Sequence, residues 1–188
     1  MKILTKDEIN VNKEVILEVI KNGAIFIHPT DTIYGIGCNA LEEKFVDAVR
    51  EMKGRPESPF SVLVPSKKWI KENCVVSKEA EKWLNKLPGP YTLILKVKDG
   101  VAKNVAPGLD TLGVRIPDHW FSKLVEELGI PIVTTSANKA GNDFMTSLDD
   151  LDDEIKPKLE FVVYEGEKHG KPSKIVDLTG TEVRVKER

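Results

Sequence analysis

The sequence has few of the features that mark several large classes of protein. Its 188 residues include two cysteines, Cys38 and Cys74, which lie far apart and form no CxxC pair. This pattern indicates neither a disulfide framework nor a thiol redox motif. Cys38 lies in an apolar segment, which predicts a small buried residue. No apolar run approaches the roughly 18 residues of a membrane-spanning helix, and the charged N-terminus has no signal-peptide core. We therefore expect a cytoplasmic protein without a membrane partner.

Motifs of the commonest nucleotide, hydrolase and metal sites are also missing. The chain has no GxxxxGKS/T, no GxGxxG after its first predicted strand and no GxSxG. Its three histidines, His28, His119 and His169, do not fall at HExxH or other metal-binding spacings. The sequence therefore excludes a P-loop and predicts no protein metal site. An ATP site in this chain has to be of another design.

The charge balance argues against a globally basic nucleic-acid binder. Lys and Arg number 28 and Asp and Glu number 30, which gives a net charge of -2. A local basic groove stays open as an alternative. The chain is long enough for one buried core and short for two, and its composition shows no break. We expect a single domain over residues 1–188.

Apolar periodicity predicts alternating helices and strands. Helices are expected near 11–21, 41–52, 78–87 and 118–128, with Asp118 as the cap of the last of these. Strands are expected at 24–28, 60–64, 91–97, 112–116 and 131–135. An acidic helix near 148–155 and late strands within 161–166, 174–179 and 182–186 follow. This order predicts an α/β domain with a mixed sheet.

Two polar segments next to predicted strands are candidate phosphate sites. Lys53 and Arg55 lie in a Gly/Pro turn after a helix, where they either offset the helix dipole or clamp an anionic group. Residues 134–138, TTSAN, either form a turn through their own side chains or present hydroxyl and amide groups to a phosphate or an adenosine. Taken alone, each motif favours the structural interpretation.

A third segment, PTDTIYG at residues 29–35, groups Thr30, Asp31, Thr32 and Tyr34. These side chains offer enough hydrogen-bonding groups to hold the polar atoms of an amino acid. Arg115 lies inside an apolar strand and needs an anionic partner. That partner is either a structural carboxylate or the carboxylate of a ligand.

Together, six blocks in this order resemble the YrdC-like family of threonylcarbamoyl-AMP synthases. The blocks are HPTDTIYGIGCNA, KGRPESPFSVLV, PGPYTLILK, GVRIPDH, PIVTTSANKAG and PSKIVDLTG, and they span residues 28–180. The resemblance implies a twisted, mixed open sheet flanked by helices around a large, positively lined cavity. It also implies that L-threonine, bicarbonate or CO2, and ATP react to give threonylcarbamoyl-AMP and pyrophosphate, the first step of t6A synthesis in tRNA.

The resemblance assigns roles to residues that match the family motifs. Lys53, Arg55, Ser136 and Asn138 are implied to be catalytic and to hold the ATP phosphates. Further nucleotide contacts are implied for Thr111 and Arg184, with Arg188 as the competitor of Arg184. L-Threonine is implied to bind Thr32, Arg115, Thr134 and Ser173. Mg2+ is implied to come with ATP, and a separate t6A transferase to take the product.

The chain departs from the family pattern at two positions and leaves two alternatives open. A histidine that some members carry near Leu63 is absent, and Lys174 follows Ser173 where threonine or glutamate is commoner. The length resembles the short form without the extra C-terminal domain. One alternative is the handling of carbamoyl-adenylate, as in hydrogenase maturation. The other is a non-catalytic RNA-binding module, and weak tRNA association is also compatible with the synthase.

Overall fold

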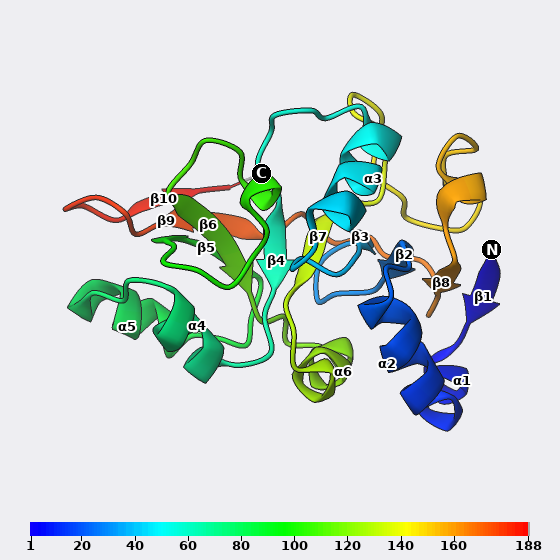
Figure 1. Ribbon diagram of the computed structural model, residues 1–188, viewed down its shortest axis with the longest axis horizontal. Helices are drawn as coiled ribbons and strands as arrows, with labels where there is room; N and C mark the ends of the chain where they lie inside the picture. Colours follow the sequence, from blue (N-terminus) through cyan, green and yellow to red (C-terminus); the bar gives the residue numbers. More distant parts are fainter. Residues whose placement is uncertain (188) are drawn as a thin grey trace.

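A computed structural model describes residues 1–187, which form a mixed sheet in the order β1-β8-β2-β3-β7-β4-β6-β5-β9-β10 (Figure 1). The strands are β1 (Lys2–Leu4), β2 (Phe26–His28), β3 (Gly35–Gly37), β4 (Ser61–Leu63), β5 (Tyr91–Lys96), β6 (Thr111–Arg115), β7 (Ile132–Ser136), β8 (Phe161–Val163), β9 (Lys174–Asp177) and β10 (Arg184–Lys186). The sheet combines parallel pairs such as β4 and β6 with antiparallel pairs such as β4 and β7. The predicted α/β class with a mixed open sheet is confirmed.

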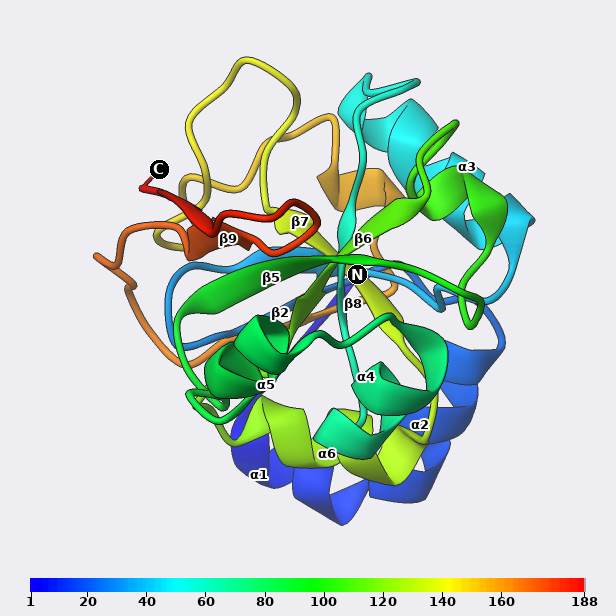
Figure 2. The same ribbon diagram turned by 90° about the vertical axis from the view of Figure 1, so that its left-hand side faces the viewer.

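Helices cover both faces of the sheet unequally. They are α1 (Lys6–Val11), α2 (Lys13–Lys21), α3 (Glu43–Lys53), α4 (Lys67–Asn73), α5 (Lys78–Leu84) and α6 (Phe121–Leu128), with short 3-10 turns η1 (Lys103–Val105) and η2 (Lys156–Lys158). Figure 2 shows α1, α2, α4, α5 and α6 on one face and α3 on the other. No helix in residues 1–187 is long and apolar enough to cross a membrane.

Alternation along the strands divides the buried side chains between two clusters. Phe26 packs with Phe121 and Phe161 against α1, α2 and α6, and its neighbour Ile27 belongs to the other cluster. Adjacent strand residues point to opposite faces, so a three-residue strand serves both clusters. Cys38 and Cys74 are free and buried, as predicted for Cys38.

The end of α3 sets the position of the KGRP turn. Val46, Val49 and Met52 bury one face of this helix. Gly54 then adopts a left-handed conformation with φ 63°, which ends the helix and reverses the chain. The predicted stop at this glycine is confirmed. Arg55 therefore leaves the helix toward the strand ends.

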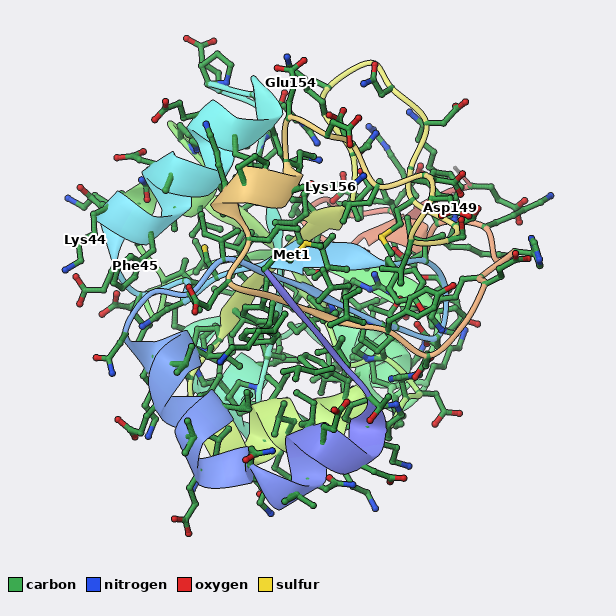
Figure 3. The ribbon with its side chains drawn as sticks, turned by 90° about the vertical axis from the view of Figure 1, so that its right-hand side faces the viewer. Met1, Lys44, Phe45, Asp149, Glu154 and Lys156 are labelled. Carbon is green, nitrogen blue, oxygen red and sulfur yellow. The ribbon has the colours of Figure 1, made fainter. Side chains whose placement is uncertain are left out.

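The predicted acidic helix at 148–155 is wrong. Only turns and bends occupy that range, and Asp150 accepts hydrogen bonds from Thr146 and Ser147. Such local side-chain bonds compete with a helix for the backbone donors. Figure 3 shows Asp149 and Glu154 on the side of the molecule that carries α3, away from α1 and α2.

The predicted cap at Asp118 is also wrong. Helix α6 begins at Phe121 with Trp120 as its N-cap. Asp118 lies outside the helix, and its backbone N–H donates to Asp31 Oδ2 at 3.0 Å. This hydrogen bond connects the segment that follows β6 to the PTDT segment.

Candidate active site

A pocket of about 270 Å³ lies at the ends of the central strands. Its walls come from β3, β4, β5, β6 and β7, from the turn between α3 and β4, and from the segments that follow β2, follow β7 and precede β9. The lining residues are Thr30, Ile33, Tyr34, Gly35, Arg55, Pro59, Phe60, Ser61, Thr92, Arg115, Thr134, Thr135, Ser136, Phe144, Pro172 and Ser173. Five predicted site residues, Arg55, Arg115, Thr134, Ser136 and Ser173, thus share one pocket. Its volume is below the range of about 300–1,000 Å³ usual for drug-sized ligands, so the large cavity stays a prediction.

Arg115 is held at the pocket wall by two groups of the PTDT segment. Its Nη2 donates to Asp31 Oδ1 at 3.1 Å and to Thr32 Oγ1 at 3.2 Å. The Arg115 and Asp31 side chains are 8% and 10% exposed, so the ion pair is buried. The structural carboxylate considered from the sequence is therefore present. Because Arg115 also lines the pocket, its pairing with Asp31 fixes a cation at the pocket wall, where a guanidinium can pair with an anionic group.

The PTDT turn is fixed by its own hydroxyl groups. Thr30 Oγ1 donates to the Ile33 carbonyl at 2.7 Å and accepts from the Thr32 N–H at 3.1 Å. The Tyr34 hydroxyl donates to the Gly166 carbonyl at 2.7 Å and accepts from the Glu165 N–H. Tyr34 therefore fastens a neighbouring segment with its hydroxyl, and it is also one of the lining residues of the pocket.

The floor of the pocket depends on a glycine that the sequence analysis did not single out. A Cβ on Gly113 would lie 2.6 Å from Ser61 Oγ and 3.1 Å from Thr92 Cγ2. Thr92 Oγ1 and Ser173 Oγ are hydrogen-bonded at 2.7 Å. Ser61 and Thr92 are thus lining residues that were missed. A glycine inside an otherwise apolar strand was the available signal of a close approach.

Lys53 lies beneath the pocket rather than on its surface. It is fully buried, and Nζ donates to the carbonyls of Ser136 and Asn138 at 2.6 and 2.5 Å and to Asn138 Oδ1 at 3.1 Å. An ammonium has three N–H donors, and all three have acceptors in the SAN segment. Burial, and then the charge of Arg55, lower the pKa of Lys53 to about 7. Lys53 fixes the conformation of Ser136 and Asn138, and a phosphate contact has to replace one of its hydrogen bonds.

Two predicted nucleotide contacts lie away from the pocket. Thr111 begins β6 and lines a separate cavity of about 360 Å³. It lies four positions before Arg115, or about 13 Å along a strand, although both side chains are on the face that includes Gly113. Arg184 is exposed on β10, opposite Asp177. Its competitor Arg188 lies outside the described residues.

The segment from Glu165 to Pro172 crosses the PTDT turn and closes one side of the pocket. Glu165 accepts hydrogen bonds from Trp120 Nε1 and Lys168 Nζ and pairs with His119 Nε2, all within 2.8 Å. Lys168 Nζ also donates to the Thr30 carbonyl at 3.0 Å. We call residues 165–172 the crossing segment. The crossing segment joins the start of α6 to the pocket, because its first residue, Glu165, contacts His119 and Trp120.

Gly170 lets the crossing segment rest directly on Thr32. A Cβ at this position would lie 2.3 Å from the Thr32 carbonyl oxygen, a backbone atom that does not yield easily. We expect Gly170→Ala to displace the segment and to raise the KM for the small ligand of the pocket by about tenfold or more, because displacements near 1 Å are enough for such losses. Steady-state kinetics test this. Gly180→Ala is the matched control, because its new Cβ would meet nothing closer than 3.8 Å, and equal effects of the two changes would contradict the prediction.

His28 is a buried neutral histidine behind the pocket. Its ring stacks on Phe121 with a centroid distance of 5.1 Å, and Nδ1–H donates to the Pro29 carbonyl at 3.3 Å. Within residues 1–187, Nε2 has no hydrogen-bond partner. Burial, with smaller effects from Arg115 and His119, lowers the pKa of His28 to about 3. The neutral ring is therefore part of the folded state.

This pKa predicts a loss of stability in acid. The unfolded chain binds a proton at His28 near the ordinary histidine value of about 6.5, whereas the folded chain does so only near 3. As the pH falls between these values, the free energy of unfolding decreases by up to about 1.4 kcal/mol per pH unit. His28→Phe keeps an aromatic ring without the titration, so urea unfolding at several pH values is expected to show a shallower slope. Parallel pH profiles of the two proteins would contradict this assignment.

The fold and the pocket define an α/β domain whose strand ends place two arginines and several hydroxyl groups around a small ligand site. A family model described as "Telomere recombination" (Sua5/YciO/YrdC) matches residues 18–188. The chain belongs to the Sua5/YciO/YrdC family, which confirms the resemblance seen in the sequence.

Named relatives are similar along most of this chain. A protein from Methanocaldococcus jannaschii, provisionally named threonylcarbamoyl-AMP synthase, is 40% identical over 94% of this chain and 87% of its own length. The threonylcarbamoyl-AMP synthase of Pyrococcus abyssi is 35% identical over 85% of this chain and 48% of its own length. The crystal structure of P. abyssi Sua5 with L-threonine has a TM-score of 0.88 and 30% identity, and the match covers 98% of this chain and 56% of that one. The chain thus spans about half the length of the Pyrococcus relatives.

Proposed function

We propose that this protein is a threonylcarbamoyl-AMP synthase, which converts L-threonine, bicarbonate or CO2, and ATP to threonylcarbamoyl-AMP and pyrophosphate. The observation that carries the proposal is the buried Arg115, oriented by Asp31 and Thr32 at the wall of a hydroxyl-lined pocket that also contains Arg55. The named relatives and the Sua5 complex with L-threonine support it.

L-Threonine fits the chemistry and size of the pocket. The threonine carboxylate pairs with the guanidinium of Arg115, which Asp31 already holds in a fixed orientation. The hydroxyls of Thr134 and Ser173 line the same space and offer partners for the amine and the side-chain hydroxyl. A volume of about 270 Å³ suits an amino acid better than a whole nucleotide.

ATP then has to approach from outside, with its phosphates at the rim. Arg55 and Ser136 line the pocket, and Asn138 continues the segment that Lys53 holds from below. These groups surround the place where the α-phosphate meets the amino acid. Thr111 lies on the same face of β6 as Arg115 but lines a separate cavity, so its contact with the remainder of the nucleotide stays a prediction.

The reaction needs no covalent bond to the enzyme. The threonine amine adds to CO2, forms an N–C bond and loses a proton, which gives a carbamate. A carbamate oxygen attacks the α-phosphorus, and the bond to pyrophosphate breaks; starting from bicarbonate, water is also released. Negative charge increases on the phosphoryl oxygens, so a fixed guanidinium and amide donors supply the main catalytic effect.

Mg2+ is proposed to enter with ATP. The pocket lining named above contains hydroxyls and arginines but no carboxylate, and in residues 1–187 no group of three acidic, histidine or cysteine side chains is placed to hold a metal. Mg2+ commonly keeps water and substrate phosphates as its ligands. A pocket without carboxylates is therefore compatible with Mg2+ that is held by the ATP phosphates and water. We further propose that a separate transferase uses the product for t6A synthesis.

Pyrophosphate release tests the proposed reaction. With ATP, Mg2+ and bicarbonate present, addition of L-threonine is expected to start pyrophosphate release. Carbamoyl phosphate in place of threonine and bicarbonate tests the alternative of carbamoyl-adenylate chemistry. Release that depends on carbamoyl phosphate and not on threonine would replace the proposal with that alternative.

A further inference from the structure

Arg50, on the last turn of α3, is a buried arginine whose donors all serve backbone carbonyls. It is 5% exposed. Nη1 donates to the carbonyls of Arg55 and Ser58, both at 2.9 Å, and lies 3.3 Å from that of Pro56. Nε and Nη2 donate to the Asn104 carbonyl at 2.8 and 2.5 Å, and Nη2 also donates to the Val105 carbonyl at 3.1 Å. Since arginine has five N–H donors, its capacity is fully used by the protein.

The backbone of Arg55 is held from both sides by this one residue. The Arg55 N–H donates to the Arg50 carbonyl at 3.0 Å, and the Arg55 carbonyl accepts from Arg50 Nη1. The two guanidinium groups also lie near one aromatic ring, because Arg50 Cζ is 4.4 Å and Arg55 Cζ 5.8 Å from the centroid of Phe60. Phe60 is buried, and its N–H donates to the Val105 carbonyl, which Arg50 also contacts. Arg50 thereby ties the turn at 54–58 to η1 and to the pocket wall.

We infer that Arg50 is a positioning residue that fixes the turn at 54–58 and thereby aims Arg55 at the phosphates of ATP. A planar guanidinium reaches carbonyls in several directions at once, which a lysine ammonium on a flexible stem does not reproduce. The surrounding carbonyls leave Arg50 no donor for a ligand, so it acts through Arg55. The inference rests on the proposed function for its substrate and deepens it.

A double-mutant cycle tests this role. Arg50→Lys is expected to raise the KM for ATP by about tenfold, while the KM for threonine changes by less than about twofold, since only the phosphate ligand is displaced. Because Arg55 is itself proposed to be catalytic, the cycle is completed by equilibrium binding. Arg50→Lys is expected to raise the Kd for ATP by about tenfold when Arg55 is present and by less than about twofold in an Arg55→Ala background, because residues that act as a unit are not additive. Additive effects, or equal changes in both KM values, would overturn the positioning role.

A second variant covers the case in which Arg50→Lys does not fold. Ser58 is exposed, and glycine in its place loosens the turn without removing a carbonyl that Arg50 contacts. Ser58→Gly is expected to raise the KM for ATP by about threefold, and Ser58→Ala, which keeps the backbone restricted, is the control. Equal KM values in these two variants count against the inference.

Equilibrium binding of ATP with Mg2+ separates this inference from the proposed function. One outcome is that the wild type binds ATP, the variants show the expected non-additive effects on the Kd for ATP, and no threonine-dependent turnover is seen. In that case only the proposed reaction fails. If turnover is normal and the effects are additive, only the role of Arg50 fails. A wild type that binds no ATP overturns both.

Discussion

Arg115→Met is expected to abolish threonine-dependent pyrophosphate release and to destabilise the protein. The substitution removes the cation proposed for the threonine carboxylate, and it leaves Asp31, whose side chain is 10% exposed, without its partner. Breaking a buried ion pair in this way typically costs about 3–5 kcal/mol. Chemical denaturation and the release assay measure the two effects separately.

The double variant Arg115→Met/Asp31→Asn distinguishes binding from folding. Asparagine still accepts the Asp118 N–H that Asp31 Oδ2 accepts at 3.0 Å, but it carries no buried charge. Most of the lost stability is therefore expected to return, whereas threonine-dependent release is not. Recovery of release together with stability would show that Arg115 serves the fold alone.

Lys53→Met is expected to remove activity and to weaken the fold. The change removes a donor that three acceptors share. The Ser136 carbonyl keeps the Asn138 N–H and Asn138 Oδ1 keeps the Ser136 hydroxyl, so the Asn138 carbonyl is the acceptor that loses its side-chain donor outright. An unsatisfied buried acceptor typically costs about 1–3 kcal/mol, and the two proposed phosphate ligands lose their fixed geometry. Thermal unfolding and pyrophosphate release at saturating ATP measure these losses.

Lys139→Met is the matched control for Lys53. Lys139 follows Asn138 directly, but it lies near the surface and pairs with Glu154 on the far side of the same loop. Exposed ion pairs contribute little, so we expect activity and melting temperature close to those of the wild type. A Lys53→Met variant that behaves like this control would show that the buried contacts do not position the SAN segment.

Helices α2, α3, α5 and α6 and most strands were predicted because their signals are local, whereas α1, α4 and β1 were not predicted. The apolar spacing of Val46, Val49 and Met52, together with the following Gly54, is enough to place α3 and its end. Strand β3 was missed because Gly35 and Gly37 have low strand preference on their own. In the fold they are required, because a Cβ on either would come within 2.9 Å of His28 or Phe26 on β2. That requirement comes from a neighbouring strand and is not visible in the local pattern.

The site was predictable as a set of motifs but not in its internal contacts. Arg55, Arg115 and Ser136 do share one pocket. The burial of Lys53 under the SAN segment depends on residues 83 and 85 positions away. The contacts of Arg50 with Asn104 and Val105 span 54 and 55 positions. Ser61 and Thr92 enter the pocket only because Gly113 leaves room for them. Such long-range pairings are set by the sheet order and cannot be derived from spacing.

Mass spectrometry of the product tests the central proposal most directly. The protein is incubated with ATP, Mg2+, L-threonine and isotope-labelled bicarbonate, and the nucleotide fraction is analysed at once. We expect an adenylate that contains both threonine and the labelled carbon, and that is absent when threonine is omitted. An adenylate without the labelled carbon, or the same nucleotides with and without threonine, would contradict the proposed reaction.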